Sequence, residues 1–218
     1  MTVSQIILTA AELIGTVAFA ISGAMVAMDR GLDLFGVLFL GVVTALGGGT
    51  VRDILLGLHP PGMFYNYRYV LLAAVVAALM FIGVFAGRNH YIRNRKQLDR
   101  ALNLFDALGL GVFAVIGTQA GIDAGHGVNA FFCVFLGMTT GVGGGILRDL
   151  LAGQKPYVFV KHIYALAAIA GSLLYYVLTW WLSLSPTLAV FPAILLVLVI
   201  RVLASRYQWN LPKIKFPE

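Results

Sequence analysis

The sequence predicts an all-α polytopic membrane protein with seven transmembrane helices, built as two inverted three-helix repeats followed by one C-terminal helix (3+3+1). Of the 218 residues, 60% are hydrophobic and 11% are charged, and the mean hydropathy is +0.91. A soluble domain carries about 25% charged residues. The apolar runs are roughly 20 residues long, which is enough to cross a bilayer as a helix. This composition excludes a soluble globular protein.

The repeats are visible as an internal duplication. Residues 47–57 read GGGTVRDILLG, and residues 143–153 read GGGILRDLLAG, 96 positions later. Upstream, residues 12–23 (ELIGTVAFAISG) match residues 106–117 (DALGLGVFAVIG) at an offset of 94. The change of offset predicts a two-residue insertion between the two matches.

The first repeat comprises residues 1–87, with spans at about 3–28, 32–58 and 68–87. The first run has no basic segment before it and no small-residue cleavage site, so we expect a retained span and not a signal peptide. The candidate polar-site residues of this repeat are Glu12, Thr44, Gly47, Gly48, Gly49, Arg52 and Asp53.

A basic segment, residues 88–101, is predicted to link the repeats on the cytoplasmic side. The second repeat comprises residues 102–183, with spans at about 102–123, 127–152 and 160–182. Residues 184–218 form a seventh span at about 187–204 and a basic cytoplasmic tail. The matching candidate residues are Asp106, Thr140, Gly143, Gly144, Gly145, Arg148 and Asp149.

The basic residues predict the orientation. Of the 15 Lys and Arg residues, one orientation places 12 on the same side of the membrane, Arg68 on the other side, and Arg52 and Arg148 within spans. Cytoplasmic loops are enriched in Lys and Arg. We therefore expect a cell (inner) membrane protein with its N-terminus outside and its C-terminus in the cytoplasm. The 12 residues are Arg30, Arg88, Arg93, Arg95, Lys96, Arg100, Lys155, Lys161, Arg201, Arg206, Lys213 and Lys215.

An odd number of spans in each repeat forces the second copy to enter the membrane from the opposite side. Such inverted repeats are common in transporters and place the polar site near the bilayer midplane. Three consecutive glycines cost about 3 kcal/mol in a helix interior, so each triplet predicts a kink or an unwound segment in its span. The alternative is that the glycines only allow close helix packing. Thr44 and Thr140 lie one turn before the triplets and are candidate pathway residues.

The intramembrane charges predict two ion pairs. Adjacent residues point to different helix faces, so Arg52 and Asp53 should need separate partners. The depth of each residue in its span favours the pairs Glu12–Arg52 and Asp106–Arg148. Asp53 and Asp149 are expected in the first turn of a second half-helix, where a carboxylate offsets the helix dipole. A purely structural ion pair explains these charges as well as a pore lining does.

These motifs resemble the bacterial members of the TRIC (trimeric intracellular cation) channel family, whose repeat unit is also described as a glycine transporter domain. The resemblance covers nearly the whole chain. It implies a homotrimer with a separate pore in each subunit, shaped by glycine-kinked spans two and five, which conducts monovalent cations such as K⁺ and Na⁺. Eukaryotic relatives carry a lysine-containing motif after the glycines, where this chain has Arg52-Asp53 and Arg148-Asp149. The gating and lipid regulation of those relatives are therefore not implied.

Two function classes remain open on the sequence. The first is a cation channel, in which the carboxylates neutralise the two arginines. The second is a secondary transporter of a small solute such as glycine, which inverted repeats suit equally well. An enzyme is not expected, because the motif lacks P-loop spacing and no nucleophile–base constellation is present. We expect membrane lipid and K⁺ or Na⁺ as partners, with no nucleic acid, no cofactor and no metal site.

Overall fold

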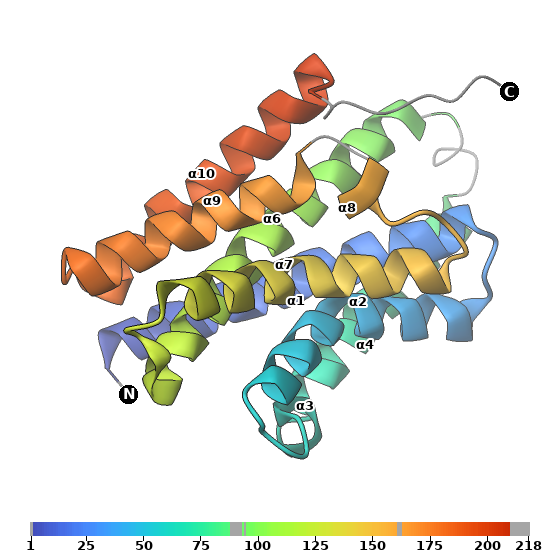
Figure 1. The fold of residues 1–218 in the computed structure, drawn as a ribbon. Coiled ribbons are helices and arrows are strands. Elements are labelled where there is room, and N and C mark those ends of the chain that lie inside the picture. The colour runs from blue at the N-terminus through green and yellow to red at the C-terminus, as the bar shows by residue number, and fades with distance from the viewer. Residues whose placement is uncertain (1, 88–92, 94, 161–162, 210–218) are drawn as a thin grey trace, which may run out of the picture.

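The computed structural model describes residues 2–87, 93, 95–160 and 163–209 as a bundle of helices (Figure 1). Seven helices are long and apolar enough to cross a membrane, and the described residues contain no strand. The all-α membrane fold and the seven spans are thereby confirmed. The elements in order are α1 (Val3–Asp29), α2 (Leu34–Leu55), α3 (Gly62–Tyr65), α4 (Arg68–Ala86), α6 (Arg95–Gly121), η1 (Ile122–His126), α7 (Ala130–Leu151), α8 (Tyr157–Val160), α9 (Tyr164–Tyr176), η2 (Val177–Trp181) and α10 (Pro186–Tyr207).

Two helix ends differ from the predicted spans, one at a glycine with positive φ and one in the basic linker. The second helix ends at Leu55, because Gly57 adopts a φ of +72° that an α-helix does not contain. α6 begins at Arg95, so the last part of the expected linker is helical. Residues 88–92 and 94 of that segment, Lys161, and residues 210–218 of the tail lie outside the described residues. The division of the chain into units stays a prediction.

The two hairpins that join the first and second helix of each repeat show where the insertion lies. Gly31 and Gly125 both have positive φ, 70° and 86°. Asp33 then caps α2 by accepting from the Gly36 amide at 2.8 Å, and Asn129 caps α7 in the same way. Gly31 and Asp33 are separated by one residue, whereas Gly125 and Asn129 are separated by three. The two extra residues therefore lengthen the second hairpin.

The two repeats pack against one another through reciprocal contacts between α1 and α6. The rings of Phe19 and Phe113 are 5.3 Å apart. Each ring lies over a glycine of the other helix: Phe19 over Gly109 and Phe113 over Gly15. Small residues at these positions let the helices approach closely. The arrangement agrees with a pseudo-two-fold relation between the repeats.

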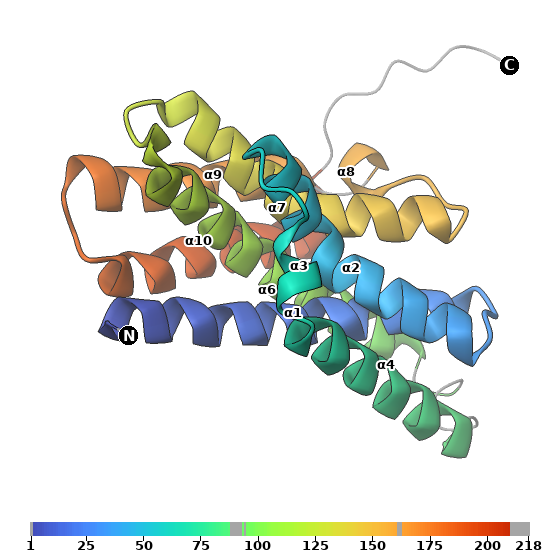
Figure 2. The same cartoon turned by 90° about the horizontal axis from the view of Figure 1, so that it is seen from below.

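The bundle has two ends, which we call the N-face and the loop face. The N-face is the end that carries the start of α1 and the turn η1, and the loop face is the end that carries the end of α1 and the start of α6 (Figure 1). α9 and α10 lie together on one side of α6, while α2 and α4 lie together on another side of the bundle (Figure 2). Large apolar side chains such as Phe35, Phe85 and Phe131 are more than 70% exposed, as expected for surfaces that meet lipid.

Candidate functional site

The glycine triplets lie where α2 and α7 cross. A Cβ atom on Gly48 would overlap the carbonyl oxygen of Thr140, and a Cβ on Gly144 would overlap the carbonyl oxygen of Thr44. A Cβ on Gly143 would come within 3.1 Å of the Gly48 Cα atom. The two helices therefore touch backbone against backbone at this crossing, and only glycine fits there.

The triplets are not unwound, and a kink at them stays a prediction. α2 runs without interruption from Leu34 to Leu55 and α7 from Ala130 to Leu151, so both triplets lie inside continuous α-helix. Tertiary packing overrides the low helix propensity of glycine here, as it commonly does. The close approach of the two helices agrees with the alternative explanation of the motif, close packing. The Thr44 and Thr140 hydroxyls are buried and donate to carbonyls of their own helices, at 2.6 Å in each case.

A buried ion cluster lies on the loop-face side of the crossing. The Arg148 guanidinium donates from Nη1 to Asp106 Oδ1 at 2.5 Å and to Ser22 Oγ at 2.6 Å. Its Nε donates to Asp149 Oδ1 at 2.8 Å. The Arg148 and Asp106 side chains are 0% exposed. The Asp106–Arg148 contact expected from the sequence is therefore present, and Asp149 shares the same arginine.

Further polar and aromatic groups close the cluster from the loop face. Gln154 donates to Asp149 Oδ1 at 2.8 Å and accepts from Arg30 at 2.6 Å. The Arg201 guanidinium lies over the Tyr164 ring, with its Cζ atom 4.6 Å from the ring centroid. Arg201 was expected in a cytoplasmic segment, but it lies inside α10 and is 2% exposed. The charge bias that predicts the orientation therefore loses one of its 12 residues.

The N-face cluster has a different set of partners. Arg52 donates from Nε and Nη2 to Asp53 Oδ1, at 2.9 Å and 2.8 Å. Glu12 Oε2 accepts from the Tyr69 hydroxyl at 2.8 Å, and within the described residues it forms no ion pair with Arg52. The expected Glu12–Arg52 pair is wrong, and so is the expectation that Arg52 and Asp53 need separate partners. The arginine side chain is long enough to fold back onto its neighbour.

Asp53 and Asp149 lie in the last turn of α2 and α7, not in the first turn of a half-helix as expected. Each carboxylate binds the segment that follows its helix. Asp53 Oδ2 accepts from the Gly62 amide and Asp149 Oδ2 accepts from the Tyr157 amide, both at 2.8 Å. The adjacent arginines supply positive charge at the helix C-termini, where the dipole favours it.

Polar cavities open on the N-face side of the crossing. One of about 260 Å³ is lined by Glu12, Arg52, Asp53, Asn66 and Tyr69, among others. A second of about 560 Å³ shares Glu12, Arg52 and Asp53, and adds Gln119 and Asp123. The Arg52 side chain is 17% exposed, whereas Arg148 is 0% exposed. The same motif therefore faces a cavity in one repeat and is sealed in the other.

Sequence reasoning missed Tyr69, Gln119 and Asp123 as lining residues. A signal for Asp123 was available, because Asp29 and Asp123 align at the offset of 94 that relates Glu12 to Asp106. No comparable signal existed for Tyr69. Among the residues that the structure describes, no group of three His, Cys, Asp or Glu side chains is arranged to hold a metal ion.

Comparison with known families identifies the chain. The model of the glycine transporter family matches residues 9–84 and 103–180, one match in each repeat. The chain belongs to the glycine transporter family. Among curated relatives of this family member, the UPF0126 membrane protein of Deinococcus radiodurans is 41% identical over 212 residues, covering 95% of this chain and 92% of the relative. The chain is an integral membrane protein, as these relatives are.

Solved structures relate this glycine transporter family member to TRIC channels. One chain, from work on conductance through TRIC cation channels, has a TM-score of 0.81 at 35% identity and covers 96% of this chain and 98% of its own length. The TRIC trimeric intracellular cation channel orthologue of Rhodobacter sphaeroides has a TM-score of 0.82 at 30% identity, covering 93% of this chain and 99% of the orthologue. The expected resemblance to bacterial TRIC channels is confirmed. The family and the structural relatives of this chain are channels or transporters, not enzymes.

Proposed function

We propose that this protein is a cation channel that conducts monovalent ions such as K⁺ and Na⁺ through a pore within each subunit. The observation that carries the proposal is the pair of N-face cavities, which share the charged residues Glu12, Arg52 and Asp53. The smaller one is also lined by Gly49 of the first triplet, next to the α2–α7 crossing. Charge within a membrane-spanning region is costly and usually serves function. The cavity lining carries the carboxylates of Glu12, Asp53 and Asp123 against one arginine, Arg52, which favours cations.

The pathway continues from this cavity through the glycine crossing to the loop face. The crossing is where the two repeats meet, and inverted repeats commonly place their transport site there. On the loop-face side the route meets the buried cluster of Arg148, Asp106 and Asp149, whose side chains are at most 1% exposed. We propose that this cluster interrupts the pore in the conformation described, and that conduction requires Arg148 to move.

The assembly and orientation belong to the same proposal. In the proposed orientation the N-face lies outside the cell membrane and the loop face in the cytoplasm, because Arg30, Arg93, Arg100 and Lys155 lie at the loop-face end and cytoplasmic ends are enriched in basic residues. A homotrimer in contact with membrane lipid is proposed from the likeness to solved TRIC channels.

A secondary transporter of a small zwitterion such as glycine is the second candidate. The observation that favours it is the 260 Å³ cavity, in which Glu12 and Arg52 present opposite charges without binding one another. A zwitterion could place its ammonium group near the carboxylate and its carboxylate near the guanidinium.

Planar-bilayer recording of the purified protein in a KCl gradient separates the two candidates. Discrete current steps that reverse near the K⁺ equilibrium potential are expected of the channel. Arg52→Ala and Arg148→Ala should each change conductance or selectivity. A silent bilayer, together with liposomes that accumulate labelled glycine, would overturn the channel proposal and support the transporter.

A further inference from the structure

We infer that Asp123 is a specificity-determining residue that concentrates cations at the N-face mouth. The inference rests on the proposed channel function and assigns a role to one side chain that lines the larger N-face cavity. Asp123 is exposed, lies in the turn η1 and lines the 560 Å³ cavity together with Glu12 and Asp53. The Asp123 carboxylate therefore lies at the N-face entrance of this cavity, where an ion would pass it before reaching the α2–α7 crossing.

The Asp123 carboxylate is held in place by a chain of neutral groups. Gln119 Nε2 donates to Asp123 Oδ1 at 2.7 Å, and the Tyr175 hydroxyl donates to Gln119 Oε1 at 2.6 Å. Tyr175 is fully buried between α6 and α10, so the chain is anchored in the protein core. Gln119 and Tyr175 are therefore positioning residues, which fix the carboxylate without removing its charge.

Charge compensation separates Asp123 from Asp53, while Glu12, like Asp123, binds only a neutral group, the Tyr69 hydroxyl. The Asp53 charge is offset by Arg52 through two hydrogen bonds. Asp123 binds a neutral amide, and among the described residues no ion pair joins it. An uncompensated carboxylate in a cavity raises the local concentration of cations and lowers that of anions.

The inverted repeat provides an internal comparison at the opposite end. Asp29 is the counterpart of Asp123, and Gly31 is the counterpart of Gly125, so the two carboxylates occupy equivalent turns at the loop face and the N-face. Asp29 is followed by Arg30, whereas Asp123 is followed by an alanine. The loop-face turn therefore has a basic residue directly beside its carboxylate, whereas in η1 the basic residue is His126, three positions after Asp123.

The size and salt dependence of the effect follow from Coulomb's law. A unit charge about 5 to 10 Å from the ion path in water changes the local cation concentration about two- to fourfold. The effect requires a screening length longer than that separation, so it is present at about 0.02 M salt and absent at 1 M, where the Debye length is about 3 Å. A structural role for Asp123 would not show this dependence on salt.

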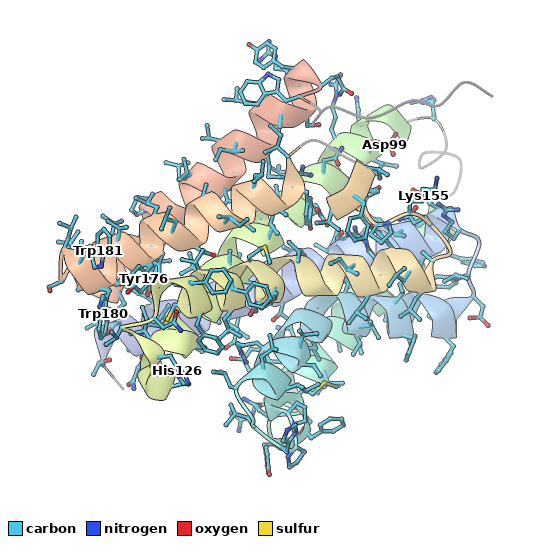
Figure 3. The ribbon with its side chains drawn as sticks, in the orientation of Figure 1. Asp99, His126, Lys155, Tyr176, Trp180 and Trp181 are labelled. Carbon is cyan, nitrogen blue, oxygen red and sulfur yellow. The ribbon has the colours of Figure 1, made fainter. Side chains whose placement is uncertain are left out.

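Single-channel recording of Asp123→Asn against wild type tests the inference. We expect K⁺ conductance to fall about two- to fourfold at about 0.02 M KCl and to equal that of wild type at 1 M KCl. In a KCl gradient the reversal potential should shift toward that of chloride. The control is Asp99→Asn, which removes an exposed carboxylate at the opposite end of the bundle from His126, the last residue of η1 (Figure 3). It should leave both readouts unchanged for currents entering from the N-face.

A cysteine at the same position separates charge from folding. Asp123→Cys should behave like Asp123→Asn, and a methanethiosulfonate that adds a sulfonate should restore the low-salt conductance. A reagent that adds a quaternary ammonium group should lower it further. Wild type is the reagent control, because its single cysteine, Cys133, is buried. Gln119→Leu should lower the low-salt conductance by less than Asp123→Asn, since it frees the carboxylate without removing it.

The outcomes distinguish this inference from the channel proposal. If wild type carries no cation current, the proposed function fails. If wild type conducts cations but Asp123→Asn keeps its low-salt conductance and reversal potential, the role of Asp123 is refuted while the channel stands. The same refutation follows if both reagents act alike on Asp123→Cys.

Discussion

Replacing Gly48 by alanine tests whether the triplets act by packing or by flexibility. The new Cβ would overlap the Thr140 carbonyl oxygen, which belongs to a helix backbone and cannot rotate away. Overpacking a tight contact costs about 1 to 3 kcal/mol, and a rigid neighbour puts this site at the upper end. Alanine regains about 1 kcal/mol of helix propensity. The expected net loss is about 2 kcal/mol.

Gly49→Ala is the matched control within the same triplet. The nearest atom to its Cβ, outside the helix backbone, is Arg52 Nη2 at 3.8 Å, which is an ordinary contact distance. This variant should gain about 1 kcal/mol of helix propensity at no steric cost. Gly48→Ala should therefore lower the free energy of unfolding by about 2 kcal/mol, and Gly49→Ala should raise it by about 1 kcal/mol. The two variants should differ in stability by about 3 kcal/mol.

Thermal unfolding of the purified protein in detergent reads out the difference. One kcal/mol shifts Tm by about 2 to 4 °C in a chain of about this size. Gly48→Ala should therefore unfold about 4 to 8 °C below wild type, and Gly49→Ala about 2 to 4 °C above it. In planar-bilayer recording, a triplet that served as a flexible element would make both variants lose current to the same extent. Equal destabilisation of the two, or a Gly48→Ala variant as stable as wild type, would refute the packing argument.

Three further predictions concern the polar groups and the turn after α7. Arg148→Met should lower the free energy of unfolding by about 3 to 5 kcal/mol, because it leaves two buried carboxylates without their cation. Arg52→Met, beside the open cavity, should lower it by about 1 kcal/mol or less. Chemical denaturation should resolve that contrast, and equal losses would contradict it. Tyr69→Phe should cost about 1 kcal/mol, and a double-mutant cycle with Glu12→Gln should show that the two losses are not additive. Gly153→Ala should lower Tm by a few degrees, because its φ of +66° costs a non-glycine residue about 1 to 2 kcal/mol; an unchanged Tm would count against the strain.

The parts of the fold that follow from one-dimensional patterns were predictable from the sequence. Hydropathy and length are enough to locate seven spans, because each must bury about 20 residues in lipid. The depth of a residue in its span limits which charges can meet, which was enough for the Asp106–Arg148 contact but not for Glu12, which binds Tyr69 and not Arg52. The duplication made the matching turns at Gly31 and Gly125 equivalent.

The remaining features depend on three-dimensional packing that periodicity does not encode. Helix propensity predicts a break at each triplet, but propensity is a weak term beside the fit of α2 against α7. The partner of Glu12 is Tyr69 because α4 lies against α1, and no sequence pattern specifies which face of α4 does so. The Arg52–Asp53 contact escapes a rule about helix faces, because that rule describes Cβ directions and not the reach of a long side chain.

The glycine crossing has a consequence for how such a chain could arise. Gly48 meets the Thr140 carbonyl just as Gly144 meets the Thr44 carbonyl, so the contact is isologous, with each half offering the other the same surface. Isologous contacts are the ones by which two identical subunits form a closed dimer. Two copies of a single ancestral repeat, inserted in opposite directions, could make this crossing without being joined. Fusion into one chain then lets the halves diverge, so that one arginine faces a cavity while its twin is sealed.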